Sequence, residues 1–278
     1  MAAKKIFQSF PAAATSVGIV PLDAAVATLE RAQQLAAQLQ LPLVKDAGEV
    51  DVVLAVREDR LELQAGGETA SSNSPGAVYC DFVTGAFGHR MRSGQVGGEM
   101  LIKAVRGRKA GRGASGALRV VDATAGLGRD AMLLGLAGFE VTALERSPII
   151  AAVLSDGLQR AREAGGRAAE AAERVELINA DAAAWLAALP EVDRPDVITL
   201  DPMFPERSKS ALVKKEMRLC RMVSGGDADA AALLDVARQV ARGRVVVKRP
   251  AHAEPLGHQS PTVSQKGRSV RYDIYAKS

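Results

Sequence analysis

The sequence Asp201-Pro202-Met203-Phe204 brings three kinds of chemical group together. Asp201 follows the apolar run DVITL, so its carboxylate is expected at the end of a buried strand. Phe204 offers a flat face on which a base can stack, and Pro202 restricts the backbone between them. Six cations and one acid follow at positions 207 to 221. The segment therefore indicates a site with a carboxylate, an aromatic face and an anionic partner.

The chemistry that suits these residues is attack by an amine whose lone pair is delocalised into an aromatic ring. The Asp201 carboxylate or the Pro202 carbonyl can bind the hydrogens of such an amine and orient its lone pair. The same acceptor stabilises the positive charge that develops as a C–N bond forms. No strong general base is needed when the transferred group is already activated. The alternative is an ordinary turn that ends a strand.

A glycine loop precedes this segment in the chain. In VVDATAGLGRDAMLL, Gly126 and Gly128 permit a tight turn between a strand and a helix. Together with Ala131 they match the G-x-G-x-x-A pattern of dinucleotide-binding loops. Glu145 lies 17 residues after Gly128, at the end of the next strand, where its carboxylate can hold two ribose hydroxyls. A glycine turn needed only for packing is the alternative.

The acids around the loop favour one of two candidate cofactors. NAD and S-adenosylmethionine both fit the glycine pattern, but a pyrophosphate is bound best away from anions. Asp122 precedes the loop and Asp130 follows it, and both favour a cation. S-adenosylmethionine carries a sulfonium and an ammonium, so it is the predicted cofactor. Asp181, after the third strand, can accept a hydrogen bond from the adenine amine, cap the helix at 182–189, or do both.

The cations after Phe204 predict contacts with nucleic-acid phosphates. Their position beside the expected amine site favours this over a solvated face of an amphipathic helix, the usual role of such a run. Two further cations end the fifth strand at the same edge of the sheet. The predicted RNA-contacting residues of the two groups are Arg207, Lys209, Lys214, Lys215, Arg218, Lys248 and Arg249.

Five short apolar runs are expected to be strands, namely LRVVDA, FEVTALE, RVELINAD, DVITLD and RVVVKRP. Stretches rich in Ala and Leu separate them. This alternation is typical of an α/β fold with a mostly parallel twisted sheet and helices on both faces. Ligands bind such sheets beyond the carboxyl ends of the strands, where the acids gather. Residues 263–277 are expected to form a hairpin at the sheet edge, and residues 163–174 a solvated helix or loop.

The first 75 residues have a different pattern. A strand is predicted at 16–20, an amphipathic helix at 22–39, and a hairpin around the charged turn at 57–60. The turn-rich stretch at 66–76 is a plausible boundary. The predicted domains are therefore a small α/β subdomain at 1–75 and the ligand-binding domain at 76–278.

Composition and cysteine count limit the classes of protein to which the chain can belong. The 278 residues are 47% hydrophobic, enough for a sizeable core, and the net charge of +4 agrees with an anionic partner. The two cysteines form no metal or redox motif, so we expect reduced thiols, no metal site and a cytoplasmic location. Pro11 argues against a signal peptide, and no apolar run is long enough to predict a membrane span.

Several motifs together resemble a known family. DFVTGAFGHR, VVDATAGLGRDA, LDPMFPERSKSALVKKEMR, RVVVKRP and RYDIYA are similar to motifs of the RsmJ-type methyltransferases. The resemblance implies a class I methyltransferase with a Rossmann-like sheet and S-adenosylmethionine as cofactor. It also implies methylation of the guanine N2 of one guanosine near the 3′ end of 16S ribosomal RNA, as RNA or within the 30S subunit. Asp-Pro-Met-Phe resembles the (Asn/Asp)-Pro-Pro-(Tyr/Phe) motif of nitrogen methyltransferases, with Met203 replacing the second proline.

The resemblance also implies roles for individual residues. His89 and Arg90 match the HR element of the family, for which we expect a contact with RNA or with a lid over the site. Arg129, Arg146 and Ala182 enter the cofactor set only through the resemblance. The predicted catalytic residues are Asp201, Pro202 and Phe204, and the predicted cofactor-binding residues are Asp122, Gly126, Gly128, Arg129, Asp130, Glu145, Arg146, Asp181, Ala182 and Asp201.

Three other functions stay open at this point. The same Asp-Pro-x-Phe chemistry serves adenine N6 or a protein glutamine, although a peptide substrate would not need the cations. A non-catalytic RNA-binding assembly factor would bind RNA without methyl transfer. An NAD-dependent oxidoreductase would bind NADH.

Overall fold

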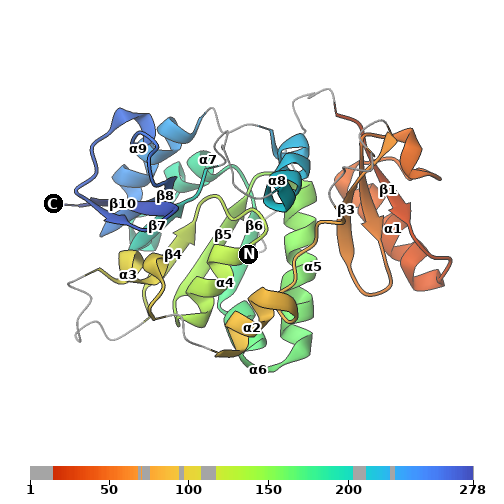
Figure 1. The fold of residues 1–278 in the computed structure, drawn as a ribbon, viewed down its shortest axis with the longest axis horizontal. Helices are drawn as coiled ribbons and strands as arrows, with labels where there is room; N and C mark the ends of the chain where they lie inside the picture. The colour runs from red at the N-terminus through yellow and green to blue at the C-terminus, as the bar shows by residue number, and fades with distance from the viewer. Residues whose placement is uncertain are drawn as a thin grey trace. The chain divides into compact units, whose positions relative to one another are not determined.

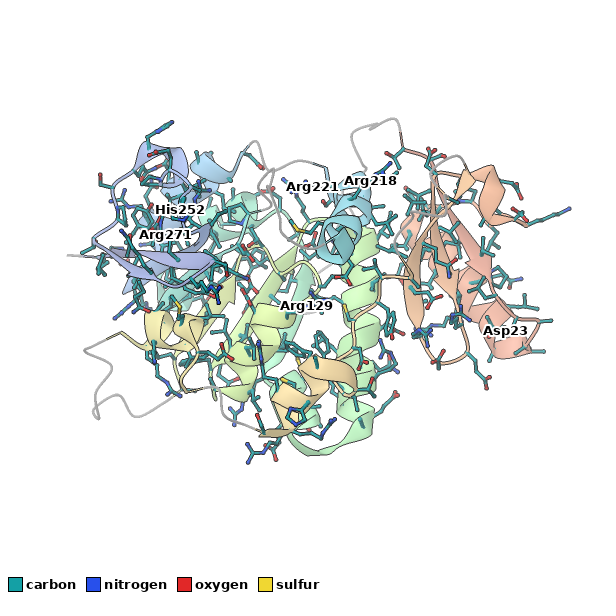
Figure 2. All side chains as sticks on the ribbon, viewed as in Figure 1. Asp23, Arg129, Arg218, Arg221, His252 and Arg271 are labelled. Atoms are coloured by element: carbon teal, nitrogen blue, oxygen red, sulfur yellow. The ribbon has the colours of Figure 1, made fainter. Side chains whose placement is uncertain are left out.

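The computed structural model describes residues 15–67, 70, 76–93, 97–107, 117–202, 211–225 and 229–277, without the side chains of 211–215. Figure 1 shows the fold, and Figure 2 shows its side chains. The chain divides into two compact units. The first draws on Met1–Cys80, Ser147–Leu158 and Pro205–Gly226, and the second on Asp81–Arg146, Gln159–Phe204 and Asp227–Ser278. The predicted boundary at residues 75 and 76 adjoins a stretch outside the described residues, and it stays a prediction.

The second unit is built on a seven-stranded sheet of order β6-β5-β4-β7-β8-β10-β9 (Figure 1). The first five strands of this order are parallel, and β10 is antiparallel to both β8 and β9. The predicted mostly parallel α/β sheet and its C-terminal hairpin are both confirmed. The strands are β4 (Arg119–Asp122), β5 (Glu140–Glu145), β6 (Val175–Asn179), β7 (Val197–Leu200), β8 (Arg244–Pro250), β9 (Val263–Lys266) and β10 (Val270–Ala276).

The strand order reverses direction between β4 and β7, and parallel sheets bind ligands outside the carboxyl ends of the strands at such a point. Short helices connect the strands and cover the sheet. They are α2 (Gly85–Ser93), α3 (Met100–Arg106), α4 (Arg129–Leu136), α6 (Gly166–Glu173), α7 (Ala182–Ala187) and α9 (Ala230–Val240), with 3-10 turns at Glu191–Asp193 and Leu256–His258. The longer α5 (Pro148–Ala164) contributes to both units.

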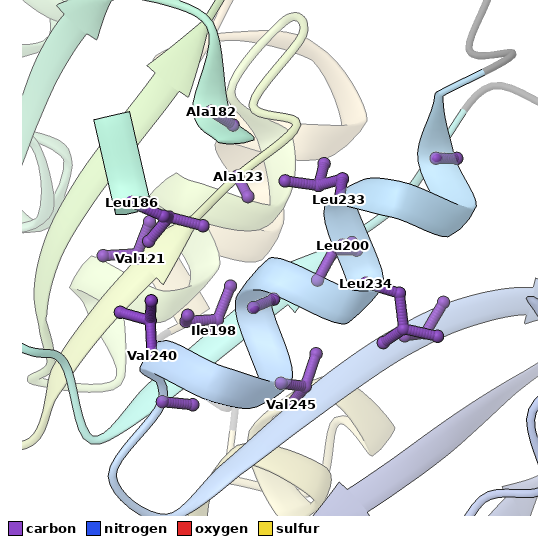
Figure 3. Close-up of a cluster of buried hydrophobic side chains, with 14 of the residues drawn as sticks. Val121, Ala123, Ala182, Leu186, Ile198, Leu200, Leu233, Leu234, Val240 and Val245 are labelled. Atoms are coloured by element: carbon purple, nitrogen blue, oxygen red, sulfur yellow. The ribbon is translucent and has the colours of Figure 1, made fainter. Parts of the chain in front are cut away.

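Side-chain alternation gives the two faces of this sheet different characters. On one face, Ile198 and Leu200 of β7 pack with Val245 of β8 against α7 and α9 (Figure 3). Leu233 and Leu234 of α9 are part of this apolar cluster. Successive strand residues point to opposite faces, so the intervening positions lie on the other side. There the sheet carries several polar side chains near its carboxyl edge.

The stretch at 163–174, predicted as a solvated helix or loop, is helical and largely exposed, but one face of it is packed. Ala169, Ala171 and Ala172 of α6 are buried, and α6 packs against α4. A Cβ on Gly135 of α4 would lie 2.5 Å from the Ala171 carbonyl oxygen, so the close approach of the two helices requires glycine there. The low-complexity alanines therefore serve close packing rather than solvation.

The first unit contains a three-stranded sheet of order β1 (Val17–Pro21), β2 (Val52–Val56) and β3 (Leu61–Ala65). β1 and β2 are parallel, and β2 and β3 form the predicted hairpin. At the hairpin end, Arg57 and Arg60 bind the two carboxylate oxygens of buried Glu62 at 2.7 and 2.9 Å. The helices are α1 (Val26–Leu39), α8 (Ala211–Ser224), which packs against β2 and β3, and a 3-10 turn at Ala47–Glu49.

Only part of the predicted apolar stripe of α1 is buried. Leu22, Val26 and Leu29 are 38%, 70% and 39% exposed, whereas Ala32 and Leu39 of the same stripe are buried together with Thr28. The helix follows the prediction, but the apolar residues at its start are more exposed than the pattern predicts. Across the described parts of the chain, no helix has both the length and the apolar character needed to cross a bilayer.

Candidate active site

The glycine loop lies between β4 and α4, at the carboxyl edge of the sheet. Gly126 and Gly128 have φ angles of 53° and 73°, a left-handed conformation that glycine adopts without strain. The Gly126 N–H donates a hydrogen bond of 2.9 Å to Glu145 Oε2. Glu145 is 7% exposed at the end of β5. The predicted pairing of loop and acid is therefore present as a direct contact.

Three aspartates and one lysine form a cluster beside this loop. Lys248 Nζ lies 2.7 Å from Asp201 Oδ2 and 2.9 Å from Asp130 Oδ2. Asp122 is 3% exposed at the end of β4. Its electrostatic environment includes Asp130, Asp201 and Lys248. The structure thus brings together four residues that the sequence predicted separately, and it gives Lys248 carboxylate partners that the sequence did not predict.

The register of the sheet explains this cluster. Leu200 of β7 pairs with Val247 of β8, so Asp201 and Lys248 each stand one residue beyond that pair. Lys248 in turn pairs with Tyr272 across the antiparallel ladder of β8 and β10. Alternation places these side chains on the face opposite the apolar cluster of α9. Tyr272 was missed by the sequence analysis, and only the insertion of β10 beside β8 brings it here.

Asp201 is tethered to the glycine loop through its backbone. Its N–H donates to the Thr124 hydroxyl at 2.6 Å, and Pro202 is buried. Thr124 is a second residue that sequence reasoning missed, although it stands inside the quoted motif VVDATAG. The tether joins the loop after β7 to the loop after β4. Phe204, Arg207 and Lys209 lie outside the described residues, as do the side chains of Lys214 and Lys215, so their predicted roles stay predictions.

The pKa of Asp122 is raised from its ordinary value of 3.8 to about 7. Burial is the main cause, and the charges of Asp130 and Asp201 add to it, whereas the Thr124 N–H and Lys248 act in the opposite direction. Between these two pH values the unfolded carboxyl loses its proton while the folded one keeps it. Since the folded state then binds more protons, the free energy of unfolding falls as the pH rises through this window.

Replacing Asp122 with asparagine should flatten that part of the pH dependence. We expect the variant to be more stable than wild type near pH 7.5, with the difference shrinking toward pH 4, because asparagine cannot ionise in the buried position. Urea unfolding at several pH values measures this. If the free energy of unfolding changed with pH equally in the two proteins, the pKa of the Asp122 carboxyl would not be raised in the folded state.

The other predicted cofactor residues lie around the same edge. Asp181 precedes α7, and its Oδ1 accepts the Ala184 N–H at 2.8 Å, so its predicted capping role is confirmed and its contact with adenine stays a prediction. Ala182 is buried in the first turn of that helix. Arg146 pairs with Asp229 at 3.1 Å. Arg129 is exposed at the start of α4 (Figure 2).

The predicted RNA-contacting cations differ in their exposure to solvent and in their contacts. Arg218 is exposed on α8 of the first unit (Figure 2). His89 is exposed on α2, and Arg90 beside it lies 3.6 Å from Glu99. Arg249 is only 7% exposed and its Nε donates to the Glu254 carbonyl at 3.0 Å. This placement argues against a phosphate contact by Arg249, because its guanidinium already holds the chain that follows β8.

These residues fit a positively charged cofactor. Four acids, Asp122, Asp130, Glu145 and Asp201, line the carboxyl edge around one ammonium, that of Lys248. A pyrophosphate would meet these carboxylates, whereas a sulfonium or an amino group would be stabilised by them. Among the described residues, a Cβ on Gly126 would have only the Thr124 carbonyl oxygen nearby, at 4.0 Å, so these residues leave space for a ligand on this side of the loop.

Comparison with known proteins agrees with this arrangement. Residues 34–277 match the family model described as "Putative SAM-dependent methyltransferase", where SAM is S-adenosylmethionine. The chain is 47% identical over 247 residues to ribosomal RNA small subunit methyltransferase J of Thioalkalivibrio sulfidiphilus, covering 88% of this chain and 92% of that protein. The protein of the same name from Cellvibrio japonicus is 44% identical over 267 residues, with 93% and 97% covered.

A solved structure is similar over almost the whole chain. The crystal structure of a SAM-dependent methyltransferase from Neisseria gonorrhoeae is 34% identical and superposes with a TM-score of 0.69, covering 93% of this chain and 95% of that one. The fold is thus that of the class I methyltransferases, and S-adenosylmethionine is the cofactor. The chain belongs to the ribosomal RNA small subunit methyltransferase J family of S-adenosylmethionine-dependent methyltransferases.

Proposed function

We propose that this protein transfers a methyl group from S-adenosylmethionine to the exocyclic N2 of a guanosine in the small-subunit ribosomal RNA. The observation that carries the proposal is the position of Asp201. Its carboxylate stands at the carboxyl edge of the sheet and is joined by Lys248 to α4, while its backbone N–H binds Thr124 beside the glycine loop. An acceptor for an amine therefore adjoins the place where a class I fold binds its cofactor.

The cofactor, when bound, supplies a methyl group that its positively charged sulfur has already activated. The work of the chain is then to position the acceptor. The Asp201 carboxylate accepts a hydrogen bond from the guanine amine and turns the nitrogen lone pair toward the methyl carbon. As the N–C bond forms and the C–S bond breaks, the sulfur keeps the bonding pair. The nitrogen loses one proton, which Asp201 accepts and passes to water.

The substrate part of the proposal rests on charge and on the names of the relatives. We propose 16S ribosomal RNA, as free RNA or within the 30S subunit, as the partner, and the cytoplasm as the place where they meet. Exposed Arg218 and the other cations of 207–218 would bind phosphates, and Phe204 would stack on a base that has left its own stack. His89 and Arg90 remain proposed contacts for RNA or for a lid.

The reaction is tested by methyl transfer from labelled S-adenosylmethionine to unmodified 16S RNA and to 30S particles lacking the modification. The RNA is then digested to nucleosides. Label in N2-methylguanosine supports the proposal, and the preferred substrate shows which form of the RNA is used. Label in another nucleoside, or none in either RNA while the cofactor binds, would contradict the proposed acceptor.

Glu145 provides a separate test of cofactor binding. Replacing it with alanine should weaken S-adenosylmethionine binding by about 10- to 100-fold, because a charged acceptor of hydrogen bonds is lost and the Gly126 N–H loses its partner. Isothermal titration calorimetry measures the change. Glu140→Ala, at the exposed start of the same strand, is the matched control and should bind as wild type does. Equal affinity of the two variants for S-adenosylmethionine would show that Glu145 does not bind the cofactor.

A further inference from the structure

Lys248 stands between two carboxylates that belong to different parts of the site. Asp201 follows β7 and is the proposed amine acceptor, whereas Asp130 is in the first turn of α4, directly after the glycine loop. The Lys248 ammonium lies within 3 Å of both, at 2.7 and 2.9 Å. Its side chain is 26% exposed, and these two contacts take up its charge within the site. A lysine held in this way is poorly placed to serve as a surface contact for phosphate.

The backbone around Lys248 is held by β10. Lys248 pairs with Tyr272 of this strand, which is 6% exposed. Arg271 of the same strand binds the turn that follows β8, and its Nη1 donates to the Ala251 carbonyl at 3.1 Å and to the Ala253 carbonyl at 2.5 Å. The backbone that carries the ammonium is therefore fixed by contacts within the sheet.

The charges that face this ammonium come from every neighbouring element of the site. They are the carboxyls of Asp122, Asp130 and Asp201, the phenol of Tyr272, and Glu99, which acts on Tyr272 from the start of α3. Desolvation opposes the charged form of Lys248, but Asp201 and Asp130 outweigh it and raise the lysine pKa. The two carboxylates therefore stabilise the charged form of Lys248.

We infer that Lys248 is a positioning residue for methyl transfer, which keeps the Asp201 carboxylate ionised and oriented toward the amine through its bridge to Asp130. This inference rests on the proposed role of Asp201. It differs from the expectation, drawn from the sequence, that Lys248 contacts RNA. The two roles predict changes in different kinetic constants.

The test compares Lys248→Met, Lys248→Arg and wild type in steady-state methyl transfer. In Lys248→Met, kcat should fall about 10- to 100-fold, because the charge-assisted hydrogen bond to the Asp201 carboxylate is lost. The acidic limb of the pH profile of kcat should move up by about one pH unit or more, because Asp201 loses its neighbouring cation. The KM for RNA and its salt dependence should stay as in wild type. Lys248→Arg should keep the wild-type acidic limb and recover part of kcat.

Cofactor affinity separates this role from a general loss of structure. Removing one positive charge leaves the site more negative, so S-adenosylmethionine should bind Lys248→Met at least as tightly as wild type. A damaged fold would weaken that binding. Lys266→Met, an exposed lysine on β9 of the same sheet, should match wild type in every constant.

Two results would overturn the inference. An increase in the KM for RNA with unchanged kcat would assign Lys248 to the RNA surface, since loss of a phosphate contact weakens binding and lowers the salt dependence. Unchanged kcat together with an unmoved acidic limb would show that Asp201 does not depend on the ammonium. Asp201→Ala, assayed in parallel, distinguishes the two proposals. If that variant is inactive the role of Asp201 stands, and if it is fully active the proposed role of Asp201 fails by itself.

Discussion

Replacing Asp201 with alanine is expected to lower the rate of methyl transfer by about 100- to 1000-fold, the usual cost of losing one preorganised group at a site of developing charge. The carboxylate is the group proposed to bind the acceptor amine, and Lys248 holds it in place while Thr124 binds the backbone N–H of the same residue. Single-turnover transfer from labelled S-adenosylmethionine measures the change without interference from product release.

The fold should survive this substitution. The Asp201 side chain is 44% exposed, so its removal leaves no cavity in the core, and Asp130 remains to pair with Lys248. Asp193→Ala, an exposed acid of a 3-10 turn, is the matched control. Cofactor binding and the urea midpoint are to be measured for both variants. Transfer at close to the wild-type rate by a folded Asp201→Ala protein would refute the proposed role.

Replacing Arg271 with alanine is expected to give the largest loss of stability, on the order of 3 to 5 kcal/mol. Arg271 binds both carboxylate oxygens of Asp273 at 2.9 Å, and Asp273 is 0% exposed. Without the guanidinium, the carboxylate keeps the hydrogen bond from the Ser264 hydroxyl, at 2.6 Å. A buried charge without its counter-charge costs far more than the pair contributed.

The pH dependence gives this prediction a second readout. In the wild type, burial tends to raise the pKa of Asp273, but the hydrogen bonds from Arg271 and Ser264 outweigh it and lower the pKa below 3.8. In Arg271→Ala, burial would dominate and raise that pKa, so the loss of stability should grow as the pH rises from 4 to 7. Urea unfolding at both pH values measures it. Exposed Arg268 of the neighbouring turn provides the control Arg268→Ala, and equal midpoints for the two variants would contradict the argument.

Local patterns predicted the elements of the second unit well. The five β-branched runs are parallel strands, and the final stretch is the expected hairpin, because strand propensity and turn chemistry act over a few residues. The G-x-G loop and Glu145 were also predictable, since the motif places both at the carboxyl ends of adjacent strands. The prediction of a solvated helix or loop at 163–174 missed its buried alanines, because alanine gives no signal of its own. Its burial depends on the close approach that Gly135 of α4 permits.

The sequence by itself determined the strands, the glycine turn and the acids that follow the strands, and family motifs within it pointed to a methyltransferase. Tertiary structure decided how those groups act on one another. The sequence predicts Lys248 to be a surface cation that contacts RNA. The pairing of β8 with β7 and β10 instead places it between Asp201 and Asp130. The raised pKa of Asp122 has the same origin in part, because its burial and the charge of Asp201 come from elements distant in sequence. Electrostatic interactions depend on separation in space and on solvent access, and strand order and register set both.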